Sequence, residues 1–315
     1  MHESKLAIFA ALVGNLAIAI VKMIAAVITG SSAMVSEAIH SLVDTGNQGL
    51  LLLGLKRSKK PPDLEHPYGH GRELYFWSFV VAVAIFAVGG GVSVYEGIRH
   101  LLAPVVIEDP FWNYVVLGFA FVFESISWFF GWRAFRTRLG KQGPLRAIQR
   151  SKDPTVFIVI LEDSAAIAGL VIAFLGVYFG HLWRNPYLDG TASILIGLLL
   201  GLIAVFLAYE TKGLLIGEGY DRKTLEELRQ TIGSDQDIDR INRLLTLFFG
   251  PEDVMLTVEV RFRDRLTTEQ IRAAVKRIRE KIRAQHSEIK RIYFAAEKMV
   301  DSPGDEKLQS HAAND

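Results

Sequence analysis

Six long apolar stretches in the first two thirds of the sequence constrain its fold more than any other feature. They are Leu6–Ile28, Ala33–Leu55, Leu74–Ile98, Phe111–Trp132, Pro154–Phe179 and Leu188–Tyr209. A helix needs about 20 mostly apolar residues to cross a bilayer, so each stretch predicts one membrane span. The first stretch also resembles a secretory signal, but it contains Asn15 and Lys22 and leads through the turn at Thr29–Ser32 into the second. We therefore expect an uncleaved span.

Composition indicates a mosaic of membrane and soluble parts. Hydrophobic residues make up 50% of the chain and charged residues 22%, which fits neither an ordinary soluble protein nor a chain that is membrane-embedded throughout. The formal net charge is +1, so nucleic acid is not an expected partner. Cysteine is absent, which excludes disulfides and thiolate metal ligation. A bound metal would need His, Asp, Glu, Asn or backbone oxygen ligands.

Basic residues in the short loops predict the orientation of the chain. They gather between the second and third stretches and between the fourth and fifth: Lys56, Arg57, Lys59, Lys60, Arg72, Arg133, Arg136, Arg138, Lys141, Arg146, Arg150 and Lys152. Cytoplasmic loops of membrane proteins carry such an excess. We expect both termini in the cytoplasm, with the bacterial plasma membrane as the location.

His40 and Asp44 are separated by one helical turn inside the second apolar stretch. Residues four apart share one face of a helix, and ionisable side chains within a bilayer mark ion or proton pathways. Counted from the span ends at 1.5 Å per residue, Glu162 and Asp163 of the fifth stretch reach a similar depth. These residues predict a metal-binding site near the midplane. The alternative is that each carboxylate is satisfied by a buried partner such as Lys22; for Glu162 both roles stay open, because adjacent helical residues point about 100° apart.

Other polar residues at this depth have weaker patterns. Glu37 and Asn47 lie near the stripe of His40 and Asp44, and Glu37 is either an outer gate or a packing group. Glu124, in the fourth stretch, is read as a packing group, with an accessory proton carrier or a partner of Lys22 as alternatives. Ser127 is expected to serve helix packing.

The loop at residues 62–72 holds a second cluster of potential metal ligands. Asp63, His66 and His70 supply one carboxylate and two imidazoles, a set suited to Zn²⁺ or another borderline divalent ion. Because exposed loops often contain such residues without binding metal, ligation and an ordinary loop are both open.

The sequence after Tyr209 predicts a small soluble domain. Helices are expected at Lys223–Ile232 and from the capping box Thr267–Gln270 to about Gln285, and strands at Ile241–Phe249, Val254–Phe262 and Ile289–Phe294. This order reads as an α+β sandwich with one covered sheet face. Ser302–Asp315 is expected to be disordered. The predicted division is a transport domain at 1–212, a cytoplasmic dimerisation domain at 213–300 and a tail at 301–315.

The chain resembles the cation diffusion facilitator family of divalent-metal/proton antiporters over nearly its whole length. The matching features are Asn15, Lys22, Gly30–Ala33, Glu37–Asp44, His66–Gly71 and Asp189–Ser193. The resemblance implies a homodimer of six-span protomers with a C-terminal ferredoxin-like cytoplasmic domain. It also implies that His40, Asp44 and Asp163 are transport ligands, and that Asp63, His66 and His70 form a second site.

One departure bears on the transported metal. Well-studied zinc members carry His-x-x-x-Asp on the fifth span, whereas Val159 stands four residues before Asp163 here. The Glu162–Asp163 pair resembles an acidic-pair branch of the family, and Glu162, Asn47 or water would complete the ligand shell. An oxygen-richer site discriminates less against Mn²⁺ or Fe²⁺, so we expect Zn²⁺ first, with a Mn²⁺, Fe²⁺ or broad-specificity antiporter as the alternative.

The expected function is efflux of a divalent cation in exchange for protons, by alternating access around the midplane site. Metal and protons compete for the same ligands, and His40 is the expected exchangeable proton carrier. No enzyme motif and no prosthetic group is expected; the metal is the substrate and lipid surrounds the protein. A passive channel or a metal sensor is the less favoured alternative.

The C-terminal domain is expected to dimerise without a histidine-built metal cluster. In well-studied bacterial zinc transporters of the resembled family, a His-rich binuclear site clamps this interface, but Asp221–Met299 contains only His286. We expect apolar contacts instead, with Leu244, Leu247, Phe248 and Phe249 as candidates, about half of which should face the domain's own core.

Overall fold

The computed structural model describes residues 2–104, 110–139 and 152–296. The predicted disordered tail and most of the second basic loop lie outside these ranges. The chain divides into two compact units, residues 1–216 and 217–315, and each is considered by itself. The functional roles expected for the two parts stay predictions.

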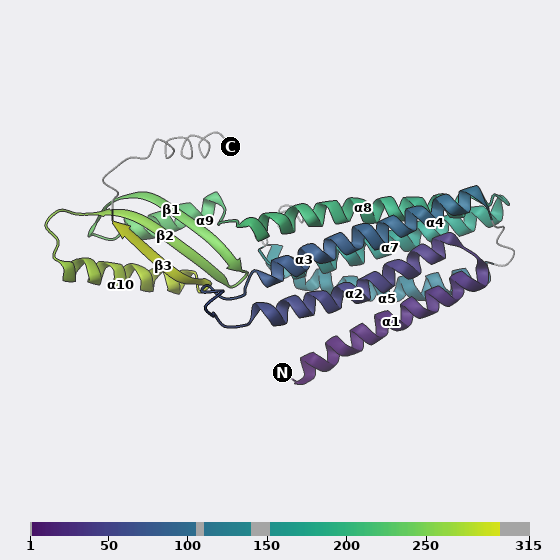
Figure 1. The fold of residues 1–315 in the computed structure, drawn as a ribbon, viewed down its shortest axis with the longest axis horizontal. Helices are drawn as coiled ribbons and strands as arrows, with labels where there is room; N and C mark the ends of the chain where they lie inside the picture. The colour runs from purple at the N-terminus through teal and green to yellow at the C-terminus, as the bar shows by residue number, and fades with distance from the viewer. Residues whose placement is uncertain (1, 105–109, 140–151, 297–315) are drawn as a thin grey trace. The chain divides into compact units, whose positions relative to one another are not determined.

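The first unit is a bundle of long helices that run side by side (Figure 1). Its elements are α1 (His2–Thr29), α2 (Ser32–Ser58), α3 (Glu73–Ala84), the π-helix η1 (Ile85–Gly90), α4 (Gly91–Leu102), α5 (Phe111–Leu139), α7 (Pro154–Leu182) and α8 (Tyr187–Ile216). All six apolar stretches are therefore helical. The third is longer than predicted, because α3, η1 and α4 follow one another without a break from residue 73 to residue 102.

Four of the described helical segments are long and apolar enough to cross a membrane. They are Glu73–Leu102, Phe111–Arg133, Phe157–Leu182 and Tyr187–Ile216. Asn15–Thr29 of α1 is apolar but shorter, and α2 is outside this set. Since α2 carries Glu37, His40 and Asp44 in its interior, one helix with candidate ligands lies outside this set, whereas Glu162 and Asp163 lie within the candidate span Phe157–Leu182.

Local signals in the sequence explain where the helices begin. Gly30 adopts a positive φ of 69° in the turn after α1, a conformation that glycine reaches without steric cost. The hydroxyl of Ser31 then caps α2 by accepting from the backbone N–H of Met34. At α7, the Asp153 carboxylate accepts from Thr155 N–H, and Pro154 occupies the first turn.

Glycine allows α4 and α8 to approach closely. A Cβ atom on Gly97 would lie 2.7 Å from the carbonyl oxygen of Gly190, and one on Gly197 would lie 2.8 Å from that of Gly90. Small residues at such contacts let helix backbones pack tightly within membranes. These two glycines therefore fix α8 against the third predicted span.

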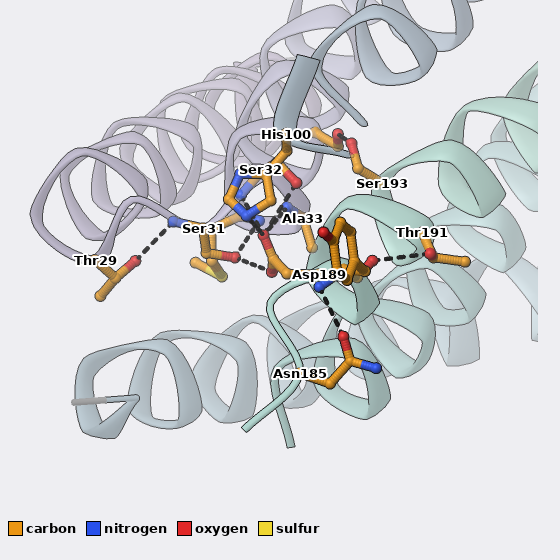
Figure 2. A network of polar contacts seen from close by, with 12 residues as sticks. Thr29, Ser31, Ser32, Ala33, His100, Asn185, Asp189, Thr191 and Ser193 are labelled. Atoms are coloured by element: carbon orange, nitrogen blue, oxygen red, sulfur yellow. Dashed lines mark hydrogen bonds and ion pairs between the residues drawn. The ribbon is translucent and has the colours of Figure 1, made fainter. Parts of the chain in front are cut away.

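Asp189, at the start of α8, ties this helix to the turn between α1 and α2 (Figure 2). Its Oδ1 accepts from the hydroxyl of Ser31 at 2.5 Å, and its Oδ2 accepts from Ser32 N–H at 2.6 Å and from Ser32 Oγ at 3.0 Å. His100 of α4 places Nε2 3.7 Å from the same Oδ2. A carboxylate at the N-terminus of a helix is favourable, so Asp189 stabilises the beginning of α2 from another helix.

The second unit is a three-stranded sheet with two helices. Its elements are α9 (Arg222–Gly233), β1 (Ile238–Gly250), β2 (Asp253–Phe262), α10 (Thr268–Gln285) and β3 (Ile289–Ala296). The sheet order is β1-β2-β3, with β1 and β2 antiparallel and β2 and β3 parallel. The predicted element order and the capping box of Thr267 and Gln270 are confirmed, although β1 begins three residues earlier than predicted.

One face of this sheet packs against both helices. The core contains Val254, Leu256, Val258 and Val260 of β2 together with Leu228 and Ile232 of α9 and Ile278 and Ile282 of α10. In β1, Phe248 belongs to this core and Leu244 packs against it. These two residues, half of the predicted dimer candidates, are therefore core residues, whereas Leu247 is paired with Met255 on the opposite face.

Candidate metal sites

A stripe of polar side chains runs along the interior of α2. Glu37, His40, Asp44 and Asn47 follow one another at spacings of three or four residues, and Ser41 lies four residues after Glu37 and three before Asp44, so they lie on one face. The four other than Asp44 are buried, and the Asp44 side chain is 13% exposed. His40 Nε2 lies 3.4 Å from Asp44 Oδ2. The structure thus places the predicted imidazole and carboxylate side by side.

Lys22 of α1 reaches this stripe and pairs with Glu37. Its Nζ lies 3.0 Å from Glu37 Oε2 and donates to Ser41 Oγ at 2.8 Å. The sequence left open which carboxylate pairs with Lys22. In the structure, the Lys22 ammonium pairs with Glu37 and is not hydrogen-bonded to Asp44 or Glu124.

Glu162 and Asp163 of α7 have different partners. Asn47 Nδ2 donates to Glu162 Oε1 at 2.8 Å, linking α2 to α7. Ser127 Oγ donates to Asp163 Oδ2 at 3.0 Å, linking α5 to α7. The two neighbouring carboxylates are therefore each held in place by a polar group from a different helix.

A small cavity of about 10 Å³ lies where these helices meet. It is lined by Asn15, Ser41, Asp44, Gln48, Glu124, Val159, Glu162 and Asp163. Such a space is close to the minimum that holds one water molecule. The lining brings Asp44, Glu162 and Asp163 together as expected and adds Glu124 of α5, so four carboxylates from three helices share one small polar space.

His40 does not line this cavity, but it contacts Asp44, which does. Four buried atoms at this place have no hydrogen-bond partner among the described residues. They are both ring nitrogens of His40, Asp44 Oδ1 and Asn47 Oδ1. Buried polar atoms are normally paired, so these atoms mark a place where donors, water or a cation would be accommodated. Imidazole nitrogen with several carboxylate oxygens is a donor set for borderline and hard divalent cations.

Asp63, His66 and His70 come together in the loop between α2 and α3. In the described part of the chain, this is the one group of three such residues whose ligand atoms all lie within 4.8 Å of one another. His66 Nδ1 lies 3.3 Å from Asp63 Oδ1, and His70 Nε2 lies 3.4 Å from Asp63 Oδ2. The midplane residues are not gathered as closely as this loop triad.

The loop backbone shapes this triad. Gly69 has a φ of 83°, and its N–H donates to the carbonyl of His66 at 2.8 Å, closing a turn that brings the rings of His66 and His70 to 4.3 Å between centroids. The backbone N–H of His66 donates to the Asp63 carboxylate at 2.6 Å. This bond, followed by the nearby imidazoles, holds the pKa of Asp63 below its ordinary value, so the carboxylate stays available to a cation.

In the second unit, His286 lies close to residues of its own domain. His286 Nδ1 lies 3.4 Å from Glu288 Oε1, and the Tyr220 hydroxyl donates to the same oxygen at 2.6 Å. Burial, and then this bond, raise the pKa of Tyr220. These groups form a local hydrogen-bond network at the end of α10.

Several lining and supporting residues were not singled out from the sequence. Gln48 follows Asp44 by four residues, so helical spacing could have indicated it. Ser127 was assigned to packing, yet it bonds to Asp163. The contact of His100 with Asp189 joins residues 89 positions apart, and nothing local in the sequence indicates it.

Comparisons with known proteins agree with the site chemistry. Residues 8–216 match the cation efflux transmembrane domain. Over 249 residues, the chain is 34% identical to the proton-coupled zinc antiporter SLC30A9, mitochondrial, of Homo sapiens, covering 78% of this chain and 44% of the relative. It is 30% identical to metal tolerance protein C4 of Arabidopsis thaliana over 243 residues, covering 76% and 53%.

A bacterial relative covers nearly the full length of both chains. The manganese efflux system protein MneP of Bacillus subtilis is 23% identical over 288 residues, which is 90% of this chain and 92% of the relative. By contrast, this chain spans only about half the length of the zinc antiporter and the metal tolerance protein.

Proposed function

This chain belongs to the cation diffusion facilitator family, and from that premise we propose that it exports Zn²⁺ across a membrane in exchange for protons. The observation that carries the proposal is the small polar cavity in which Asp44, Glu162 and Asp163 meet between helices. Relatives that match most of this chain are metal transporters by name, which supports a transporter rather than an enzyme.

In this proposal, His40, Asp44 and Asp163 bind the cation, and Glu162 completes the ligand shell. Val159 lines the cavity where a second histidine stands in some family members, so oxygen ligands predominate. His40 pairs with Asp44 in the structure, and a modest side-chain rotation would direct its free nitrogen to a cation held by the carboxylates. The ligand atoms close in when a cation is present, because the metal offsets the repulsion among the carboxylates.

Proton exchange follows from the same ligands. A carboxylate or imidazole that binds a metal must first lose its proton. Each arriving Zn²⁺ therefore displaces protons from the cavity, and each departing Zn²⁺ leaves ligands that take protons up again. Alternating access of this site to the two sides of the membrane converts that competition into exchange.

Asp63, His66 and His70 are proposed to bind a second Zn²⁺ in the cytoplasmic loop. Its two imidazoles and one carboxylate suit a tetrahedral ion with a fourth, non-protein ligand. We assign to this site the capture of ions or the tuning of transport, while the midplane site carries the exchange itself.

The proposed architecture has six spans, including α1 and α2, with both termini in the cytoplasm of a bacterial cell. Polar residues in α2 are compatible with a span because they face the interior of the bundle. Residues 1–212 form the transport domain, 213–300 a ferredoxin-like dimerisation domain and 301–315 a tail. The functional protein is a homodimer.

A second candidate substrate is Mn²⁺, favoured by the oxygen-rich cavity and by the likeness to MneP. Proteoliposomes with a pH-sensitive dye inside separate the possibilities when Zn²⁺, Mn²⁺, Fe²⁺ and Ca²⁺ are added one at a time. We expect Zn²⁺ to produce the fastest proton movement. Faster movement with Mn²⁺ would reassign the substrate, metal flux without proton movement would indicate a channel, and no flux with any ion would reject transport.

A further inference from the structure

Glu37 and Lys22 form a buried ion pair beside the proposed transport site. Both side chains are 0% exposed. Glu37 lies three residues before His40, on the same face of α2, and Lys22 comes from α1. Ionisable groups at such positions are costly in a membrane and are retained for function by default.

The pair is not a closed, fully satisfied unit. Lys22 contacts Glu37 Oε2, whereas Oε1 has no hydrogen-bond partner among the described residues. A buried carboxylate oxygen without a donor is costly, and a packing role alone would be served as well by apolar side chains of similar size. Glu37 therefore retains a buried carboxylate oxygen without a donor among the described residues.

Packing holds Glu37 in the bundle interior. A Cβ atom on Gly169 of α7 would overlap Glu37 Oε1, and the same site lies against Ile196 of α8. Contacts from α1 and α7 thus enclose one side chain of α2. Glycine at position 169 leaves the space that this carboxylate occupies.

The Lys22 ammonium connects Glu37 to the cavity. It also donates to Ser41 Oγ, and Ser41 lines the cavity with Asp44. One fixed positive charge therefore contacts both the Glu37 carboxylate and the cavity wall.

We propose that Glu37 is a second cation-binding position on α2, one helical turn from the transport ligands, and that the Lys22 ammonium competes with the transported cation for it. This inference rests on the proposed function. When a divalent cation moves from Asp44 toward Glu37, the ammonium is displaced; its return expels the cation. Lys22 thereby prevents a carboxylate-rich path from holding the ion too tightly.

Removing the charge of Lys22 should therefore tighten metal binding. In Lys22→Gln, an amide can still donate to Glu37, but the competing positive charge is gone. We expect the Kd for Zn²⁺ to fall at least about fivefold, since a unit charge at this range acts strongly in a poorly solvated site. Maximal transport should fall about tenfold or more, because release slows. Lys22→Arg keeps the charge and should stay near the parent value.

The double variant Lys22→Gln/Glu37→Gln is the matched control. It removes the proposed binding position together with its competitor, so the tightening should disappear. Zn²⁺ binding is measured by calorimetry on the full-length purified protein, and every variant carries alanine at Asp63, His66 and His70 so that the loop does not contribute. Lys22→Met is the second neutral variant if Lys22→Gln does not elute as a folded species.

The outcomes separate this inference from the proposed function. Tighter binding in Lys22→Gln or Lys22→Met that is reversed by Glu37→Gln supports the inference. Binding by either neutral variant that is equal to or weaker than that of the parent overturns it, as does tightening that persists in the double variant. Failure of the loop-intact protein to transport any divalent cation would instead reject the proposed function.

Discussion

Single polar residues in α2 decide what this bundle can do. Glu37, His40 and Asp44 lie in the interior of α2, which is not among the apolar span candidates in the described residues. Glu37 pairs with Lys22 of α1, His40 contacts Asp44 within α2, and Asn47 bonds to Glu162 of α7. Because Lys22 and Glu162 come from other helices, the properties of the site depend on individual polar contacts across helix interfaces. Isosteric substitutions that preserve shape and remove charge are therefore the sharpest probes.

Glu162→Gln tests whether this residue is a ligand or a packing group. Glutamine retains an oxygen that accepts from Asn47, as Glu162 Oε1 does, but it loses the negative charge. We expect Zn²⁺ affinity to fall about tenfold or more, in the range seen when supporting groups of metal sites are changed. Calorimetric titration in the loop-triad alanine background measures it, and unchanged affinity would make Glu162 a packing residue.

The sequence was sufficient to identify the candidate ligands that have a local signature. His40 and Asp44 are recognisable because their four-residue spacing shares a helix face, and Asp63, His66 and His70 because they lie in one loop. The pairing of Lys22 with Glu37 could not be chosen from depth alone, since several carboxylates reach the same level. Which atoms meet is decided by helix packing, and that information is not local.

At the scale of elements, short turns place the polar groups. The loop triad depends on the turn closed at Gly69, and α2 depends on the caps at its beginning. The turn before α2 and the loop at residues 62–72 were visible in the sequence, whereas the turn closed at Gly69 and the carboxylate that reaches α2 from α8 were not.

Gly69→Ala should weaken the loop site without removing a ligand. Alanine at a φ of 83° is strained by about 1–2 kcal/mol, so the turn that brings His66 and His70 together should open. We expect loop affinity for Zn²⁺ to fall roughly fivefold to thirtyfold, by the same strain. Gly71→Ala, at a position without positive φ, is the matched control; equal losses in both variants would refute the role of the turn.

Asp189→Asn should destabilise the first unit. The change weakens the charge-assisted bonds from Ser31 and Ser32, with an expected cost of about 1–3 kcal/mol. Thermal unfolding of the detergent-solubilised protein measures it as a lower midpoint. Thr191→Val is the control, because the Thr191 hydroxyl bonds to the Tyr187 carbonyl within α8; if the two variants unfolded alike, the link to α2 would contribute little.

At the scale of the whole molecule, we expect the exposed sheet face of the second unit to form the contact with a second copy of the chain. One sheet face is covered by α9 and α10, whereas Leu245 and Tyr293 on the other face are 47% and 48% exposed. Both residues pair with Thr257 in the sheet register, so they flank it on the same face of the sheet. The sequence predicted a dimer contact on β1 but could not assign the inward and outward faces, because the strand contains register irregularities.

Leu245→Ser/Tyr293→Ser should weaken dimerisation of residues 217–315. Loss of two central apolar contacts is expected to raise the dimer Kd about tenfold or more, measured by sedimentation of the fragment. Lys276→Ser, on the exposed side of α10, should leave association unchanged. Addition of a strong chelator should also leave the dimer intact; dissociation on chelation would show that a metal holds the interface.

The most direct test of the central claim is the coupling of Zn²⁺ and proton movement in vesicles reconstituted with the full-length protein. We expect an imposed Zn²⁺ gradient to move protons and an imposed pH gradient to move Zn²⁺, both at parent rates in Glu96→Gln, a change outside the cavity lining. Asp163→Asn should abolish both movements while the protein remains folded. Zn²⁺ flux that is independent of the pH gradient would refute coupled exchange, and full exchange by Asp163→Asn would refute the role of Asp163 in it.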